Sequence, residues 1–158
     1  MKNIILISLF VFSFSGIAPA EEPKVEVPQA QIAKAEPSPV GIWLVPAGDA
    51  KIEVYQKGEE LEGKIIWLKE PLDKDGKEKT DTKNPDEKLR NTPILNLVFL
   101  KGFRKEKDEN KWSGGTVYDA KSGSLYKGWI KPEGEKILKL RGYVGISLFG
   151  RTEEWTRQ

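Results

Sequence analysis

The side chains that most enzymes use for acid–base and nucleophilic chemistry are scarce in this chain. Its 158 residues include no histidine and no cysteine, which excludes a Ser-His-Asp triad, a thiol nucleophile and an ordinary zinc site. Asp119, Glu153 and Glu154 supply carboxylates but form no pair with a defined spacing, and adjacent strand residues point to opposite faces. We therefore predict a protein that is not an enzyme and that uses no cofactor and no metal.

The segment from Lys69 to Thr92 is rich in Lys, Asp and Glu and invites comparison with a calcium loop. With Gly76 at the glycine position of an EF-hand loop, the first ligand position falls on Pro71, which has no side-chain oxygen. The lysines between the acidic residues also oppose a cation site. We expect a solvated, turn-rich loop, and loops of this length are often functional.

Aromatic side chains and one arginine offer binding rather than catalysis. The rings alternate along three strand-like runs, and in a closed sheet one face of each strand points inward. Such rings either pack as core or line an apolar cavity, and the same alternation serves both. The arginine either meets a carboxylate or phosphate head group or pairs with a surface glutamate. The candidate ligand-binding residues are Trp67, Trp112, Tyr118, Tyr126, Trp129 and Arg141.

The elements that must position these residues are short strands. Apolar alternation or β-branched and aromatic enrichment predicts strands at 41–45, 51–56, 61–68, 94–103, 111–118, 124–131, 137–144 and 148–157. Asp86 to Arg90 would form one helical turn, and Gly114-Gly115 marks a bend or bulge. Eight antiparallel strands avoid exposed edges by closing into a barrel. The sequence therefore predicts an all-β, eight-stranded antiparallel up-and-down barrel.

The N-terminus has the order of an export signal. Lys2 precedes the apolar run from Ile4 to Phe14, and Ala18-Pro19-Ala20 supplies small residues before an acidic pair. The run is too short to span a bilayer of about 30 Å. We predict a signal peptide over 1–20 with cleavage after Ala20, a flexible Pro-rich tether over 21–39 and a barrel domain over 40–158. The mature protein would then be periplasmic or secreted, with no membrane span.

The charge balance argues against one class of partner. The formal net charge is +2, and loss of Lys2 with the leader leaves 25 basic and 24 acidic residues. Nucleic-acid binders usually carry a clear excess of basic residues. We therefore expect no nucleic acid as partner, and the sequence identifies no protein partner.

The two ends of the domain resemble lipocalins. Gly41-Ile-Trp43 opens the first predicted strand, and Arg151 and Arg157 flank Trp155 in the last. In lipocalin-like barrels a Gly-x-Trp begins the first strand and a basic residue of the final strand covers the tryptophan. The resemblance implies a plug at one end, in which a guanidinium stacks on an indole. Trp43, Arg151 and Arg157 are its candidate residues.

Ordered blocks across the whole domain resemble an exported bacterial family catalogued as domain of unknown function 2147. The blocks are Leu61-Glu-Gly-Lys-Ile-Ile-Trp-Leu68, Asp81-x-x-Asn84-Pro85 with Arg90-x-x-Pro93, Trp112-x-Gly-Gly-x-x-Tyr-Asp119, Gly123-x-x-Tyr126, Leu140-Arg-Gly-Tyr-Val-Gly145 and Phe149-Gly-Arg-Thr-x-x-Trp-Thr-Arg157. The resemblance implies a lipocalin-like barrel outside the cytoplasm, with no assigned activity.

The chain departs from the family pattern in three places. The cysteine pair of many members is absent around 56–62, and Arg90-Asn-Thr-Pro93 replaces an Arg-x-Arg-Pro pattern. Asn96 stands where glycine is usual. If the backbone there is left-handed, asparagine is acceptable, because it adopts that conformation more readily than most residues. The family's disulfide is therefore lost, and no role for the missing arginine carries over.

Two functions remain open at this point. The first is a periplasmic binder or carrier of a small hydrophobic or amphipathic molecule, such as a fatty acid. The alternative is a barrel with a solid core that acts as an envelope interaction module through the 69–92 loop or the tether. A cavity inside the barrel favours the first, and continuous packing favours the second.

Overall fold

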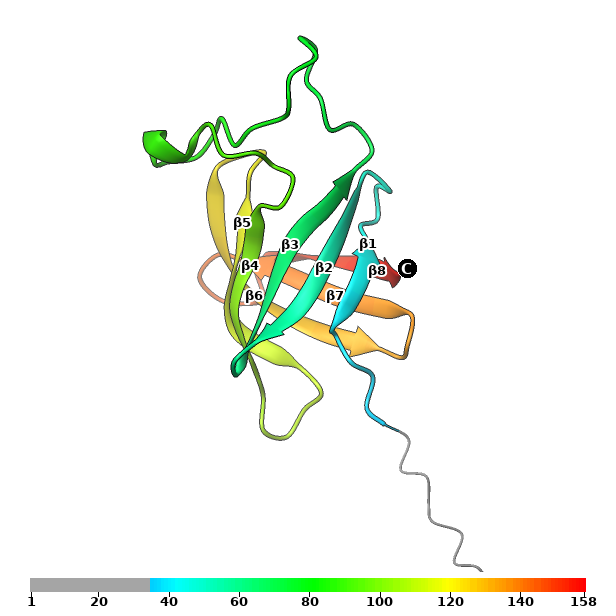
Figure 1. Ribbon diagram of the computed structural model, residues 1–158. Helices are drawn as coiled ribbons and strands as arrows, with labels where there is room; N and C mark the ends of the chain where they lie inside the picture. Colours follow the sequence, from blue (N-terminus) through cyan, green and yellow to red (C-terminus); the bar gives the residue numbers. More distant parts are fainter. Residues whose placement is uncertain (1–34) are drawn as a thin grey trace, which may run out of the picture. The chain divides into compact units, whose positions relative to one another are not determined.

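The computed structural model describes residues 35–158, so the predicted leader and most of the predicted tether lie outside the described residues. This part of the chain forms eight strands and one short 3-10 helix, and Figure 1 shows how they are arranged. The strands are β1 (Gly41–Leu44), β2 (Ala50–Lys57), β3 (Glu60–Leu68), β4 (Val98–Lys105), β5 (Trp112–Asp119), β6 (Ser124–Glu133), β7 (Ile137–Tyr143) and β8 (Gly150–Arg157). The 3-10 helix η1 (Glu87–Leu89) lies within the predicted helical turn.

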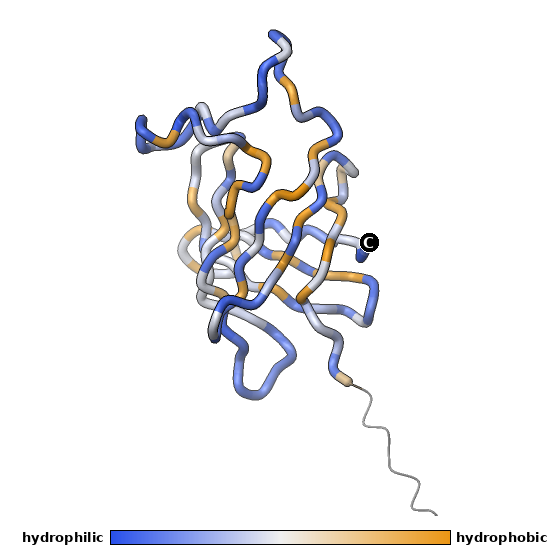
Figure 2. Tube along the Cα trace, in the orientation of Figure 1, coloured by the Kyte–Doolittle hydropathy of each residue, from blue (hydrophilic) through white to orange (hydrophobic). Residues whose placement is uncertain are grey.

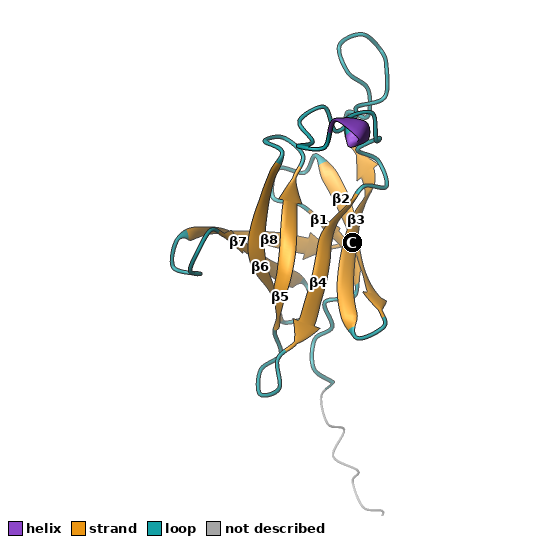
Figure 3. Cartoon of the chain, turned by 90° about the vertical axis from the view of Figure 1, so that its left-hand side faces the viewer, coloured by secondary structure: helices purple, strands orange, loops and turns teal. Residues whose placement is uncertain are grey.

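The strands form one closed barrel with the simplest order. Each strand pairs antiparallel with the next, and β1 pairs with β8 to close the sheet. The closing contact is short, with Trp43 opposite Arg157 and Leu44 opposite Thr156. Figure 3 shows the strands in orange and the connections in teal, with the 3-10 helix in the long connection above the strands. The predicted fold class, an eight-stranded antiparallel up-and-down barrel, is confirmed.

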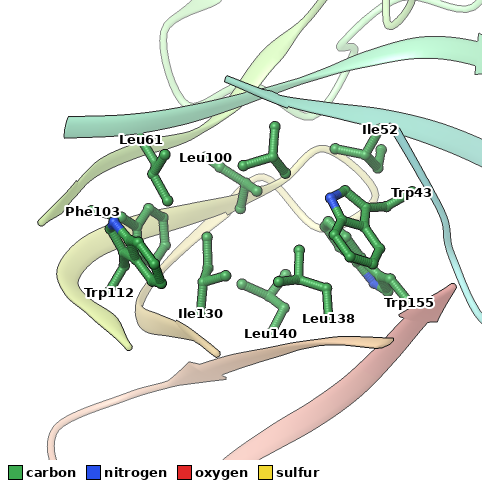
Figure 4. Close-up of a cluster of buried hydrophobic side chains, with 11 residues drawn as sticks. Trp43, Ile52, Leu61, Leu100, Phe103, Trp112, Ile130, Leu138, Leu140 and Trp155 are labelled. Carbon is green, nitrogen blue, oxygen red and sulfur yellow. The ribbon is translucent and has the colours of Figure 1, made fainter. Parts of the chain in front are cut away.

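The core follows from alternation along the strands. Apolar side chains at every second position point inward, and Figure 2 shows apolar residues in the strands and mostly polar ones in the loops. Figure 4 shows the side chains that meet inside the barrel. The buried cluster consists of Trp43, Ile52, Val54, Leu61, Leu100, Phe103, Trp112, Ile130, Leu138, Leu140 and Trp155.

The fourth strand begins later than the sequence predicts. The apolar run from residue 94 suggests an early start, but β4 begins at Val98. The residues before it form a turn, in which Leu97 N–H donates to the Ile94 carbonyl and Asn96 N–H to the Ile65 carbonyl. Asn96 has φ 67°, the left-handed conformation that the sequence anticipated for this position. A turn that requires positive φ therefore overrides the apolar pattern.

The glycine pair in β5 makes the predicted bend and also leaves room for a ring. Gly114 has φ +75°, and the pairing of β5 with β6 shifts between Trp112 and Gly115. A Cβ atom on Gly115 would collide with the Phe103 ring. The pair therefore bends the strand and lets a core phenylalanine lie against the backbone.

Successive connections alternate between the two ends of the barrel, because the strands run up and down in chain order. The connections 45–49, 69–97, 120–123 and 144–149 meet at one end, which we call the open end. The turns at 58–59, 106–111 and 134–136 meet at the other, together with the segment that leads into β1. We call this the closed end.

Candidate ligand-binding cavity

A cavity of about 1030 Å³ runs into the barrel from the open end. Strands β2 to β8 all contribute to its wall, and the four open-end connections surround its mouth. Apolar side chains form the inner part, among them Ile52, Ile65, Phe99, Val117, Leu140 and Trp155. The barrel is therefore hollow toward one end.

The floor of the cavity is the upper surface of the buried core. Trp155, Leu140 and Ile52 line the cavity and also belong to the core cluster, and each is almost fully buried. Phe99 packs against Trp155 with ring centroids 6.3 Å apart and planes tilted by 43°. This tilted contact is a favourable aromatic geometry. The interior is thus solid in one half and hollow in the other.

A carboxylate lies in the cavity wall next to the floor. Glu153 faces inward with Trp155, because both occupy alternate positions of β8, and its Oε2 accepts a hydrogen bond of 3.1 Å from Trp155 Nε1. Arg151 lies at the same face, with Nε 3.9 Å from Glu153 Oε1. From the sequence alone, Glu153 is a candidate only for catalysis, as one of three carboxylates without a defined spacing. Counting back by twos from Trp155 would have placed it inside the barrel.

The long β3–β4 connection is attached to the mouth by a buried carboxylate. Asp81 is fully buried; its Oδ1 accepts from the Tyr118 hydroxyl at 2.8 Å and its Oδ2 from Asn84 Nδ2 at 2.6 Å. We call these three residues the latch. Burial and then the hydrogen bond to Asp81 raise the pKa of Tyr118 to about 12. The phenol therefore stays a neutral donor across the physiological range.

Two further contacts fix the same connection. A Cβ atom on Gly123 would collide with the Lys83 carbonyl, so the loop lies directly against the β5–β6 hairpin. Lys79 and Thr80, just before the latch, line the cavity. The loop therefore forms part of the mouth on the β5–β6 side.

In the acidic part of that loop, a carboxylate oxygen is already hydrogen-bonded to backbone N–H groups of the loop itself. Asp73 Oδ1 accepts from the N–H groups of Asp75 and Lys77, each at 2.9 Å, and Leu72 bridges to Glu78. Within residues 35–158 no three acidic side chains come together in a geometry that could hold a metal ion.

Two of the six predicted binding residues line the cavity. Tyr126 faces inward from β6, and Tyr118 lies at the mouth, where its hydroxyl belongs to the latch. Trp112 is buried in the core cluster and does not line the cavity. Contact with a ligand stays a prediction for all six residues.

Trp67 and Trp129 lie away from the cavity lining. Trp67 is 40% exposed and carries Lys51 over its ring at 5.6 Å, and Trp129 carries Lys111 at 5.7 Å. A register shift between Lys51 and Ile52 changes which residues of β3 face inward. Trp129 alternates with the buried Gly128 and Ile130 and therefore points to the outer face.

Arg141 also points away from the interior. It alternates with the buried Leu140, and its guanidinium donates to the carbonyls of Ser147 and Leu148 and to Thr152 Oγ1 at 2.7–3.1 Å. It therefore holds the β7–β8 connection in place, where the sequence had offered a ligand head group or a surface glutamate as its partner.

The closed end carries the plug that the lipocalin resemblance implied. The Arg157 guanidinium lies 4.2 Å from the centroid of the buried Trp43 ring and donates to the carbonyls of Glu135, Val40 and Ser38. Trp43 Nε1 donates to the Pro39 carbonyl at 2.8 Å. Arg151, the other candidate for this plug, lies at the open end beside Glu153.

A closed eight-stranded antiparallel barrel, plugged at one end by an arginine on a tryptophan and hollow at the other, is a lipocalin-like fold. The chain belongs to the family described as uncharacterized protein conserved in bacteria (DUF2147), which matches residues 41–157.

Comparisons with other proteins agree on the fold. The chain is similar to the solved structure of protein HP1028 from the human pathogen Helicobacter pylori, which is described as belonging to the lipocalin family. The identity is 23%, the TM-score is 0.65, and the match covers 77% of this chain and 84% of that one. No curated protein matches the chain. No helix among residues 35–158 has the length and apolar character needed to cross a membrane.

Proposed function

We propose that this protein binds and carries a small hydrophobic or amphipathic molecule outside the cytoplasm. The cavity of about 1030 Å³ carries this proposal, because ligand sites are typically concave, largely apolar and of roughly 300–1,000 Å³. Its floor of Trp155, Leu140 and Ile52 offers apolar contacts, and polar side chains gather around the mouth.

The positions of the charged groups bear on the ligand's orientation. Glu153 in the wall would repel a ligand carboxylate placed near the floor, and Arg141 is engaged with the β7–β8 connection on the outside. A fatty acid would therefore place its chain toward Trp155 and its carboxylate at the mouth, near Lys69, Lys79 or Lys121. A ligand with a hydrogen-bond donor at its inner end would instead use Glu153.

The alternative function, a solid barrel that acts through a protein partner, requires continuous packing in the interior. The cavity favours the carrier over that alternative, and so does the attachment of the 69–92 loop by the buried Asp81. The absence of histidine and cysteine from the sequence supports a binding role rather than catalysis.

Export belongs to the proposal and rests on the sequence of residues 1–20. Expression in a bacterium should yield a periplasmic protein whose intact mass corresponds to a chain that begins at Glu21. A cytoplasmic protein that retains Met1 or the leader would contradict this part of the proposal.

Native mass spectrometry of the exported protein, purified without detergent, tests the carrier function. We expect a bound mass that disappears on denaturation and is recovered in an organic extract. A mass of the bare chain, unchanged after incubation with fatty acids and phospholipids, would overturn the proposal and favour the interaction module.

A cavity-filling variant makes this test specific. Gly142 lines the cavity, and a Cβ atom there would lie at an ordinary 3.6 Å from Tyr126 Cβ, so Gly142→Leu extends into the cavity without backbone strain. Thr116→Leu, on the outer face of β5, is the matched control. We expect Gly142→Leu to lose at least about tenfold in affinity for a fluorescent fatty acid, since bound ligand and leucine compete for the same volume. Equal binding by the two variants would place the ligand elsewhere.

A further inference from the structure

The most exposed large apolar side chains of the described residues gather at the open end. Five of them are 61–74% exposed, whereas the other exposed ones are 38–49% exposed. Four lie on the β7–β8 connection, and we call them the apolar tip: Val144, Ile146, Leu148 and Phe149. The fifth, Leu125, lies beside them, because Lys127 of β6 pairs with Tyr143 of β7.

The apolar tip is held in a defined conformation. Arg141 donates to the carbonyls of Ser147 and Leu148, and Phe149 N–H donates to the carbonyl of Ile146. Gly145 has φ +71°, which closes the turn. The side chains are therefore exposed on an ordered hairpin, so a binding event has little ordering cost.

Basic side chains lie beside the apolar tip, although the whole chain is nearly balanced in charge. Segments 120–132 and 136–152, which hold most of β6, all of β7 and the 120–123 and 144–149 connections, contain no Asp or Glu. Arg151 and Lys121, at the mouth, have side chains that are 87% and 89% exposed. The basic residues of these segments that lie toward the open end are Lys121, Lys127, Arg141 and Arg151.

We propose that the open end docks on an anionic lipid bilayer by inserting the apolar tip. A protruding apolar hairpin with cations at its base matches an interfacial anchor, in which apolar groups enter the acyl boundary and cations meet the anionic head groups. The four side chains of the tip are 61–74% exposed, and a protein partner would have to supply a matching pocket for them. A lipid surface needs no such complementarity.

Docking would also place the cavity mouth on the membrane. Val144 and Phe149 belong to the apolar tip and line the cavity, so the inserted hairpin would border the opening. A molecule could then pass between bilayer and cavity without crossing water. This last consequence rests on the proposed carrier function, whereas the docking itself does not.

Vesicle sedimentation of the exported protein tests the docking. Vesicles of equal parts phosphatidylglycerol and phosphatidylcholine are compared with vesicles of phosphatidylcholine alone. We expect binding to the anionic vesicles that weakens as salt is raised, and at least about tenfold weaker binding to the neutral ones. Failure to bind the anionic vesicles would overturn the proposal.

A pair of double variants locates the contact. Ile146→Ser/Leu148→Ser alters two tip residues that do not line the cavity, and Leu72→Ser/Leu89→Ser removes two exposed apolar side chains of the 69–97 connection. We expect the tip variant to lose about tenfold or more in vesicle binding, since less apolar surface leaves water, and the control to bind as the wild type does. Equal behaviour of the two variants would overturn the assignment to the tip.

Two further measurements distinguish membrane docking from ligand binding in the cavity and from dimer formation. The tip variant should bind the fluorescent fatty acid as tightly as the wild type, and Gly142→Leu should still bind vesicles, so either function can fail alone. Sedimentation velocity without vesicles should give a monomer for the wild type. A wild-type dimer that the tip variant abolishes would assign the tip to a second copy of the chain and overturn the proposal.

Discussion

Each end of this barrel contains an arginine that donates to three acceptors, but the two arginines stabilise opposite kinds of surface. At the closed end Arg157 donates to three carbonyl groups and stacks on the fully buried Trp43. At the open end Arg141 also has three acceptors, but it holds a hairpin whose apolar side chains face solvent. One arginine completes the core, and the other maintains an exposed surface.

The packing of the two ends differs in the same way. At the closed end Gly115 leaves room that the Phe103 ring fills completely. Beside the cavity a Cβ atom on Gly142 would meet only the Tyr126 side chain, at an ordinary 3.6 Å, and the position lines the cavity. Stability is therefore expected to reside mainly in the closed half and ligand chemistry in the open half. Four experiments test this division.

The largest effect should come from the plug. Trp43→Ala would leave a cavity in the closed half and lower the free energy of unfolding by about 3–5 kcal/mol. Trp67→Ala is the matched control, because Trp67 is half exposed and contacts Lys51, and it should cost only about 1 kcal/mol. Urea unfolding followed by circular dichroism measures both. Similar losses for the two variants would contradict the division.

Replacement of each arginine by lysine should have the next largest effect. Arg157→Lys would lose the planar stacking on Trp43 and part of the hydrogen bonding, at a cost of about 1–3 kcal/mol in unfolding free energy. Arg141→Lys removes an equivalent set of hydrogen bonds from the exposed connection and should cost under about 1 kcal/mol. Denaturant titration of both variants gives the comparison. A larger loss for Arg141→Lys would place the stability in the open half.

The latch should have a smaller and local effect. Tyr118→Phe would remove one of the two side-chain donors to the buried Asp81 and favour opening of the connection by about 1–2 kcal/mol. Native-state hydrogen exchange at the amides of Asn84 and Thr92 should accelerate. Tyr55→Phe, which removes a hydroxyl bonded to Glu62, is the control and should leave these amides unchanged. Exchange that accelerates throughout the barrel would show that the latch belongs to the global core.

The smallest effect should be the response to alkaline pH. The pKa of Tyr118 is raised to about 12 in the folded protein, so the neutral phenol contributes stability in full below pH 10. That contribution disappears as the pH rises from about 10 to 12, because the tyrosine of the unfolded chain ionises in this range while the folded phenol beside Asp81 stays neutral. The difference in tyrosinate absorbance between the wild type and Tyr118→Phe reports this titration. An ordinary tyrosine titration for Tyr118 would contradict the latch geometry.

The sequence predicted the strands well and their facing less well. Alternation and turn residues are local signals, so all eight strands were anticipated within a few residues, with β4 as the largest deviation. The side of the sheet to which a residue points also follows from alternation, but a single irregularity in a strand reverses it for the residues beyond. The register shift beside Ile52 does this without a sequence signature, whereas the glycine pair indicated the bend at Gly114 but not which residues it turns inward.

The candidate site was predicted in part for the same reason. Tyr126 follows the simple alternation of β6 and lines the cavity, as Glu153 does in β8. The latch joins Asp81 to Tyr118, which are 37 residues apart. No local pattern pairs them, because the contact depends on where the long connection lies against the β5–β6 hairpin.

The number, order and antiparallel pairing of the strands can be predicted from the sequence, because they depend on the spacing of apolar residues and turns along the chain. It also indicated the plug of Trp43 and Arg157, through resemblance at the two ends of the domain. Only the tertiary structure decided that the barrel is solid around Phe103 and hollow above Trp155. The physical reason is that filling depends on the summed volume of side chains from all eight strands, which meet only after the barrel has closed.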